Sequence, residues 1–180
     1  MSLKSHFELL ATYNQWMNSK IYEAAGHLSE TDLAKDRGAF FGSILGTLNH
    51  ILVGDTIWLK RFATHPSCLN SLREVTELQN PTSLDQIVID DLRSLFERRI
   101  WLDSKIIDWI AGLSESDLNF VLSYNNTKWV AANKRYSSLV LHFFNHQTHH
   151  RGQISTLLTQ AGVDLGVTDL LAQIPEEAHV

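Results

Sequence analysis

Residues 139–158 read LVLHFFNHQTHHRGQISTLL and contain four histidines, His142, His146, His149 and His150. The stretch has no proline and a single glycine, and its leucine, isoleucine and phenylalanine side chains recur at steps of three and four residues. This pattern predicts an amphipathic helix with one apolar stripe. The histidines that share this helix indicate what kind of chemistry the protein could carry.

His146 and His150 are four residues apart, so on a helix they lie on one face, roughly 40° and ~6 Å from each other. Both could bind one cation, for example zinc with Zn–N bonds of about 2.0–2.1 Å. His149, three residues after His146, could also point near such a site. Spacing alone leaves two interpretations open: a metal site that needs a third ligand from elsewhere, or an ordinary pair of hydrogen-bonded histidines.

The composition is that of one globular domain spanning residues 1–180, with 44% hydrophobic and 19% charged residues. A formal net charge of −5 disfavours a nucleic-acid-binding protein, which usually carries a basic stripe. Cys68 is the single cysteine, so no internal disulfide can form, which suits a cytoplasmic location. We find neither a signal-peptide pattern nor a long uncharged apolar run, and therefore expect no secretion and no membrane span.

Hydrophobic periodicity predicts four long helices. They cover residues 3–28, 43–63, 84–112 and a segment from Ser137 or Ser138 to Gly162. Ser43 and Ser83 are candidate N-caps, and Gly112 is a candidate terminator of the third helix. The predicted fold is all-α, a four-helix bundle of up-down type with at least one long crossover, in which facing helices can build a metal site.

Shorter segments connect the predicted helices. Ser29–Asp32 and Ser114–Asp117 both have a capping-box pattern, and the first predicts a short helical turn at 30–35. Residues 118–136 break the helical period and predict a small β-hairpin before the fourth helix. The apolar C-terminal tail is expected to pack across the bundle, and His179 at its end is given no role.

The second predicted helix carries Gly46, His50 and Gly54 four residues apart on one side. Glycine inside a helix costs up to about 1 kcal/mol relative to alanine, so two glycines beside a histidine need a reason. Close helix packing is one reason, and room beside the imidazole for a metal and a bound molecule is another. Val53 and Ile57 lie on this second side too, which is consistent with a subunit contact or with an extension of the core.

The chain resembles the DinB/YfiT-like family of metal-binding four-helix-bundle proteins. The segments that carry this resemblance are YNQWMN (13–18), GTLNHILVGDTIWLKRF (46–62), HFFNHQTHHRGQISTLL (142–158) and GVDLGVTDLL (162–171). The resemblance implies a divalent metal bound by three histidines, one from the second helix and two from the fourth. In this sequence they are His50, His146 and His150, all of which are present. The resemblance also implies a homodimer.

Three neutral imidazoles leave a cation its charge and an open position, as in a catalytic site. The resemblance implies either a thiol-dependent transferase, with a low-molecular-weight thiol as co-substrate, or a metal-dependent hydrolase or isomerase acting on a small molecule. Zinc is the expected metal, with nickel or iron as alternatives. A non-catalytic, stress-associated metal-binding bundle is the alternative function.

Other polar residues are candidates for supporting roles around the three histidines. His149 is the one candidate general base besides a bound water, and His142 could line the pocket. Each ligand imidazole needs a partner for its second ring nitrogen. The candidates for these partners, chosen by proximity in sequence, are Asn49, Asp55, Asn145 and Gln153.

Overall fold

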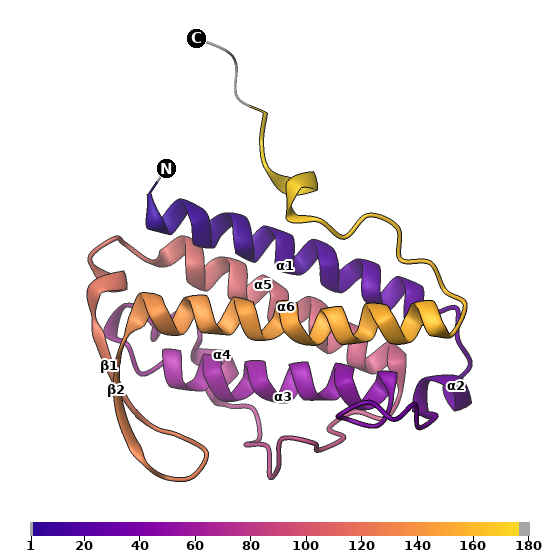
Figure 1. The fold of residues 1–180 in the computed structure, drawn as a ribbon. Helices are drawn as coiled ribbons and strands as arrows, with labels where there is room; N and C mark the ends of the chain where they lie inside the picture. The colour runs from indigo at the N-terminus through magenta and orange to yellow at the C-terminus, as the bar shows by residue number, and fades with distance from the viewer. Residues whose placement is uncertain (1, 177–180) are drawn as a thin grey trace.

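The computed structural model describes residues 2–176 and is mostly helical, as predicted. Four long helices lie side by side: α1 (Leu3–Ala25), α3 (Ile44–Phe62), α5 (Leu92–Gly112) and α6 (Tyr136–Gln160) (Figure 1). Each packs against two of the others, α1 against α5 and α6, and α3 against α6 and α5. The core between them is built from apolar side chains of all four helices. This arrangement places α3 directly beside α6.

The ends of the helices follow local hydrogen-bonding signals in most places. Ser43 begins α3, and its Oγ accepts a hydrogen bond from the Gly46 N–H at 2.9 Å. The prediction that Ser137 or Ser138 caps the last helix is wrong. This helix begins at Tyr136, directly after the hairpin, and its cap residue Arg135 makes no side-chain capping bond.

The third long helix begins eight residues later than predicted, at Leu92, with Asp91 as its cap. Residues 84–91 are not helical although their apolar spacing continues that of α5. Their backbone groups bond to α3 instead: the Asn49 Oδ1 accepts from Val88 N–H at 2.8 Å and Ile89 N–H at 3.0 Å. Because these N–H groups are already used, the helical ladder starts only after them.

The predicted hairpin is present as a two-stranded antiparallel sheet. Strand β1 (Val121–Asn125) pairs with β2 (Ala131–Arg135), and β2 leads directly into α6 (Figure 1). Four short helices complete the body of the fold. They are α2 (Glu30–Ala34), which confirms the expected turn after Ser29, η1 (Pro66–Cys68), α4 (Arg73–Thr76) and η2 (Asp117–Asn119).

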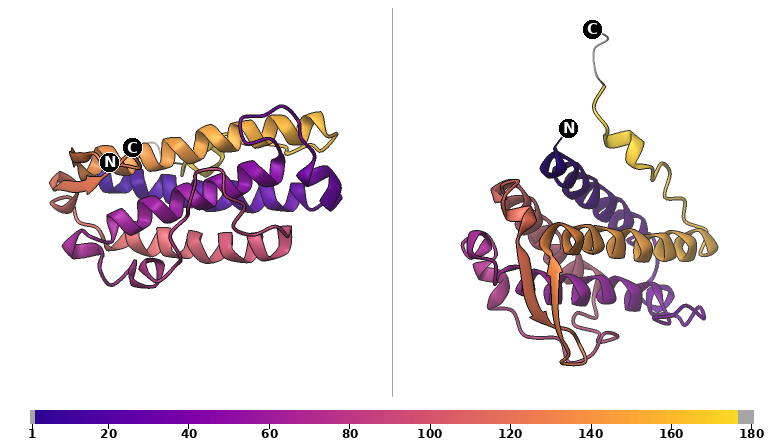
Figure 2. Two further views of the ribbon diagram at one scale, coloured as in Figure 1. Left: turned by 90° about the horizontal axis from the view of Figure 1, so that it is seen from below. Right: turned by 60° about the vertical axis from the view of Figure 1, so that its left-hand side comes forward.

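The C-terminal segment contacts the bundle only in its first part. Leu165 is buried, and the Tyr13 hydroxyl donates to the Thr168 carbonyl at 2.7 Å. Beyond that point Leu171, in η3 (Leu170–Gln173), is 75% exposed, so packing across the whole bundle is not what the structure shows. Figure 2 shows this segment leaving the end of α6 and running back past α1. His179 lies outside the described residues.

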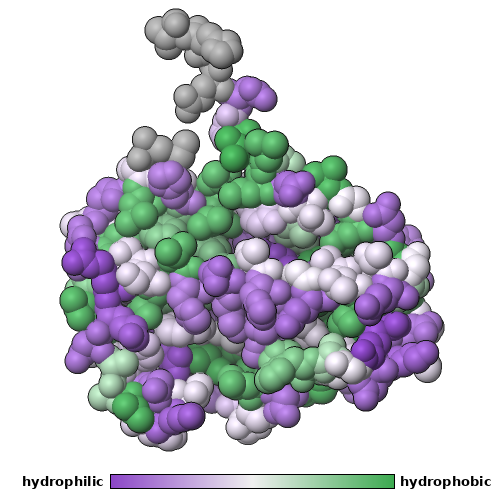
Figure 3. Space-filling view, in the orientation of Figure 1, coloured by the Kyte–Doolittle hydropathy of each residue, from purple (hydrophilic) through white to green (hydrophobic). Residues whose placement is uncertain are grey.

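The surface is mixed in polarity. The space-filling view shows a hydrophilic patch near the middle of this face of the molecule (Figure 3), and Asn145, Thr148 and His149 of α6 are exposed. Within residues 2–176, no helix is both long and apolar enough to span a membrane. Val53, considered above as part of a subunit contact, is fully buried inside the single chain and offers no surface to a second copy.

Candidate metal centre

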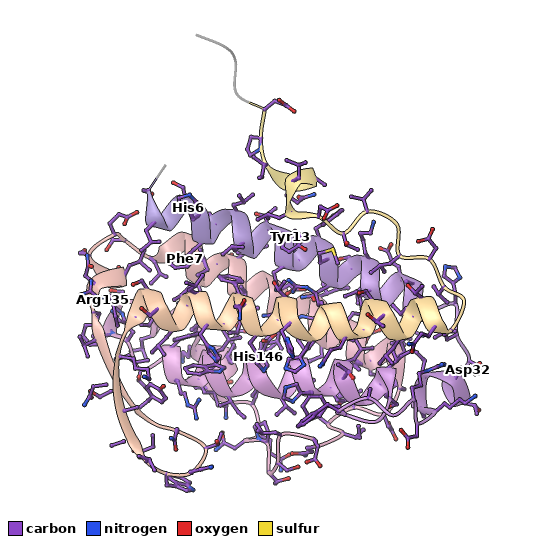
Figure 4. The ribbon with its side chains drawn as sticks, viewed as in Figure 1. His6, Phe7, Tyr13, Asp32, Arg135 and His146 are labelled. Carbon is purple, nitrogen blue, oxygen red and sulfur yellow. The ribbon has the colours of Figure 1, made fainter. Side chains whose placement is uncertain are left out.

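Three histidines from two neighbouring helices converge on one point. The Nε2 of His50, on α3, lies 3.3 Å from the Nε2 of His146 and 3.1 Å from the Nε2 of His150, both on α6. One ligand atom from each of the three lies within 4.8 Å of the others. Figure 4 shows His146 in the space between α6 and α3. The sequence prediction that these residues meet is therefore confirmed.

The spacing of the three nitrogens suits a metal ion. A tetrahedral ion with Zn–N bonds of about 2.0–2.1 Å holds its nitrogen ligands about 3.3–3.4 Å apart. The two Nε2–Nε2 distances from His50, 3.3 Å to His146 and 3.1 Å to His150, are close to this ligand separation without any rearrangement. The donor set and its geometry therefore fit a divalent cation, and three histidines are positioned to bind one.

Two of the imidazoles are oriented by carbonyl oxygens. His50 Nδ1 donates to the Leu84 backbone carbonyl at 2.7 Å, and His150 Nδ1 donates to the Gln153 side-chain oxygen at 2.8 Å. A carbonyl oxygen can only accept, so the proton of each ring sits on Nδ1 and the Nε2 lone pair faces the centre. Gln153 thus has the supporting contact that its position in the sequence suggested.

The other candidate supporting residues behave differently. Asn49 binds the backbone of Val88 and Ile89 to α3, and it makes no hydrogen bond to an imidazole. Asp55 follows Gly54 on α3 and faces the core, where it pairs with the buried Arg99 instead of a histidine. Asn145 is exposed on the outer face of α6. Proximity in sequence was a poor guide here, since successive helix residues face different neighbours.

Phe41 forms one wall of the centre and was not anticipated from the sequence. Its ring stacks on His50 with centroids 3.7 Å apart and meets His150 edge-on at 5.5 Å. Gly46 makes this possible, because a Cβ there would lie 2.2 Å from the Phe41 carbonyl oxygen. The signal in the sequence was the glycine in the first turn of α3, which indicated a close approach without identifying the partner.

Burial keeps the imidazoles neutral. It lowers the pKa of His50 and of His150, and burial together with the neighbouring His150 and His50 lowers the pKa of His146 to about 3. Desolvation disfavours the charged form, and each further imidazolium nearby would add repulsion. At neutral pH the three rings are therefore uncharged, which is the charge state that a metal requires of imidazole ligands.

A cavity of about 230 Å³ opens beside the centre, and His50, His146 and His142 are among the residues that line it. His142 lies edge-on to Trp58, with ring centroids 5.1 Å apart, so it lines the pocket as the sequence suggested. His149 is exposed, and its Nε2 lies 3.4 Å from the Gln153 amide nitrogen. It is not among the residues that line the cavity.

Gly54 leaves room for the His146 ring of α6, which packs directly against α3 at this point. A Cβ at Gly54 would lie 2.8 Å from His146 Cε1. Gly54→Ala should therefore displace the ring and lower zinc affinity by about tenfold or more, the scale at which misoriented ligands lose metal. Zinc competition titrations measure this change.

Gly152→Ala is the matched control, because nothing lies within 4 Å of a Cβ at that position of α6. This variant should keep zinc affinity and gain up to about 1 kcal/mol of stability from helix propensity. Unchanged zinc binding in Gly54→Ala would contradict the steric role of the glycine.

Comparison with known proteins assigns the chain to a family. The family model described as DinB family matches residues 1–178. The chain is similar to Protein DinB of Bacillus subtilis (strain 168), with 28% identity over 160 residues, covering 89% of this chain and 88% of that protein. No solved structure matches the chain significantly. Since the family model spans almost the entire sequence, the chain belongs to the DinB family.

Proposed function

We propose that this protein is a metal-dependent enzyme in which His50, His146 and His150 hold a divalent ion. The reaction is attack of a thiolate or water on a small electrophile, as in a thiol-dependent transferase or a hydrolase. The observation that supports this most is the convergence of three Nε2 atoms, from uncharged imidazoles, beside a cavity of about 230 Å³. A closed structural site would have a fourth protein ligand instead of an open side.

Zinc is the proposed metal, and nickel or iron would also suit three imidazoles. When bound, such an ion acts as a Lewis acid and lowers the pKa of a water or thiol at its open position. A low-molecular-weight thiol is the proposed co-substrate if the reaction is a transfer.

The residues of the chain have separate roles in this proposal. The Leu84 carbonyl and Gln153 fix two imidazoles, and Phe41 excludes water from one side of His50. His142 lines the cavity, and burial lowers its pKa, so at neutral pH it is free to accept a proton from a bound molecule. His149, the base considered from the sequence, does not line the cavity.

A non-catalytic role is the second candidate. The cluster joins α3 to α6, so a bound metal would cross-link two long helices and stabilise the fold. This observation favours a metal-binding bundle without turnover, as in a stress-associated protein.

An assay that follows metal and turnover together separates the two functions. Zinc content is measured first, and then consumption of glutathione or cysteine with chlorodinitrobenzene, and hydrolysis of nitrophenyl acetate. In the enzyme, turnover should fall to background in His146→Ala and in zinc-stripped protein, while His149→Ala stays active. Zinc-dependent stability without turnover of any substrate in a broad panel would contradict the enzyme and favour the second candidate.

We also propose the up-down four-helix-bundle topology and a homodimeric state, which the family resemblance implies, and a cytoplasmic location, which suits a chain with a single cysteine. Support for the topology comes from the four long helices, each of which packs on two others. Light scattering of the purified protein tests the homodimer.

A further inference from the structure

The cavity beside the histidines continues into a second cavity of about 670 Å³. We call the two together the hairpin groove. It runs from His50 and His146 to the β1–β2 hairpin and residues 80–84. Six residues line both parts: Ile57, Arg61, Leu84, Tyr124, Asn126 and Thr127. A molecule that reaches the histidines through the groove therefore passes Arg61.

Arg61 is a cation held in place by aromatic rings. Its guanidinium carbon lies 4.8 Å from the centre of the Trp58 ring and 5.1 Å from the centre of the Tyr124 ring. None of the ion pairs found among residues 2–176 includes Arg61. Contacts to ring faces fix the guanidinium but leave its N–H donors without an anionic partner.

The surroundings of Arg61 leave its charge uncompensated. No aspartate or glutamate is among the residues that line the hairpin groove. Lys60, the neighbouring cation, already donates to the Leu78 carbonyl and to Asn80 Oδ1. Leu84 and Ile57 add apolar side chains to the part of the groove that Arg61 lines.

We propose that Arg61 binds the carboxylate of a small-molecule substrate whose reacting end lies at the three histidines. The planar fork of a guanidinium matches a carboxylate with two parallel hydrogen bonds. Leu84 and Ile57 line the part that the two cavities share, and their side chains suit a short hydrocarbon spacer. This inference deepens the proposed function and rests on it, because the reacting end is assigned to the metal centre.

Matched thiols test the proposal on zinc-loaded protein. Mercaptopropionate and mercaptohexanoate are titrated by calorimetry beside mercaptopropanol and mercaptohexanol, since a thiol end binds zinc and only the acids carry a carboxylate. The acid of the better-fitting length should bind about tenfold more tightly than its alcohol, as expected for a charge-assisted hydrogen bond. In Arg61→Gln the difference should disappear while the affinity for the alcohol stays the same.

Arg98→Gln is the matched control. Arg98 also lies over a tryptophan, with its guanidinium carbon 5.7 Å from the centre of Trp101, but it does not line the hairpin groove. The control removes one positive charge and should leave the preference for the acid intact. An acid preference that persists in Arg61→Gln, or disappears in both variants, overturns the proposal.

The outcomes separate this inference from the proposed function. If acids and alcohols bind zinc-loaded wild-type protein equally well, the Arg61 site is wrong and the metal centre stands. If no thiol binds, the metal centre is in doubt, and hexanoate and hexanol are titrated in place of the thiols. A preference for hexanoate that is lost in Arg61→Gln then still supports the Arg61 site, whereas equal binding or none overturns it.

Discussion

Replacing His50, His146 or His150 by alanine, one at a time, should lower zinc affinity by on the order of 100-fold or more. Structural zinc sites bind with about 10–16 kcal/mol, so one of three or four ligands carries several kcal/mol. Among the described residues, no other histidine, cysteine, aspartate or glutamate belongs to the cluster, so none is placed to replace a lost imidazole. Competition with a chromophoric chelator measures the change directly.

Thermal unfolding provides an independent readout of the same loss. Zinc at about 100 times its dissociation constant stabilises the folded protein by about 2.7 kcal/mol if the unfolded chain does not bind it. For a chain of this size that corresponds to a rise in Tm of about 5–11 °C. The wild-type protein should show this rise, and each alanine variant should lose most of it at the same zinc concentration.

His142→Ala and His149→Ala are the matched controls, because both residues lie on the same helix α6 and neither belongs to the cluster of three histidines. They should keep wild-type zinc affinity. A variant of His50 that still takes up zinc as tightly as the wild type would mean that α3 supplies no ligand, and the assignment of the centre would be wrong.

The sequence could predict the relative placement of the two histidines that lie on a single helix. The spacing of His146 and His150 fixes their common face whatever the rest of the chain does. His50 is about a hundred residues away, so its approach depends on which helices are neighbours, and it entered through the family resemblance. The structure then places α3 beside α6 and confirms that the three meet.

What the sequence could not predict lies in loops and in contacts between elements. Phe41 and the Leu84 carbonyl reach His50 from segments whose conformation is set by tertiary contacts. The apolar spacing before Leu92 predicted helix, but the Asn49 side chain binds the backbone there and prevents it. Periodicity reports which side chains are apolar, and it does not report where backbone groups find partners.

Behind the metal centre, the four long helices share a buried polar network. Arg99 forms ion pairs with Asp55 and, at 3.0 Å, with Asp103, and each of these three side chains is at most 3% exposed. Asn18 donates to both Asp103 oxygens, at 3.0 and 3.1 Å. Arg151, on α6, donates to Asn14 and Gln147.

The network and the metal centre occupy adjacent faces of the same helices. Gly54 contacts the His146 ring and the next residue, Asp55, belongs to the network. On α6, His150 faces the centre and Arg151 the network. Buried charges that must pair restrict how α3 and α6 can rotate, so we infer that the network fixes the helix faces that carry the histidines.

Replacing Arg99 by methionine should destabilise the protein by about 3–5 kcal/mol, because it leaves two buried carboxylates without their main cation. For a chain of this size the Tm should fall by about 6–20 °C. Arg93→Met is the control: its ion pair with Glu97 is exposed, and its loss should change stability by less than about 0.5 kcal/mol. Thermal and urea unfolding of both variants measure the difference.

The stability lost in Arg99→Met should be larger at high pH than at low pH. Burial raises the pKa of Asp55 to about 6, and Arg99 opposes that rise. Without Arg99 the pKa of Asp55 in the folded protein rises further above its value in the unfolded chain. The variant therefore loses stability as the pH increases through the folded-state pKa. The variant should therefore lie closer to the wild type at pH about 5 than at pH about 8, and adding Asp55→Asn should recover part of the stability at the higher pH. A gap that is constant over this range, or no recovery in the double variant, would mean that Arg99 stabilises the protein through packing and not through its charge.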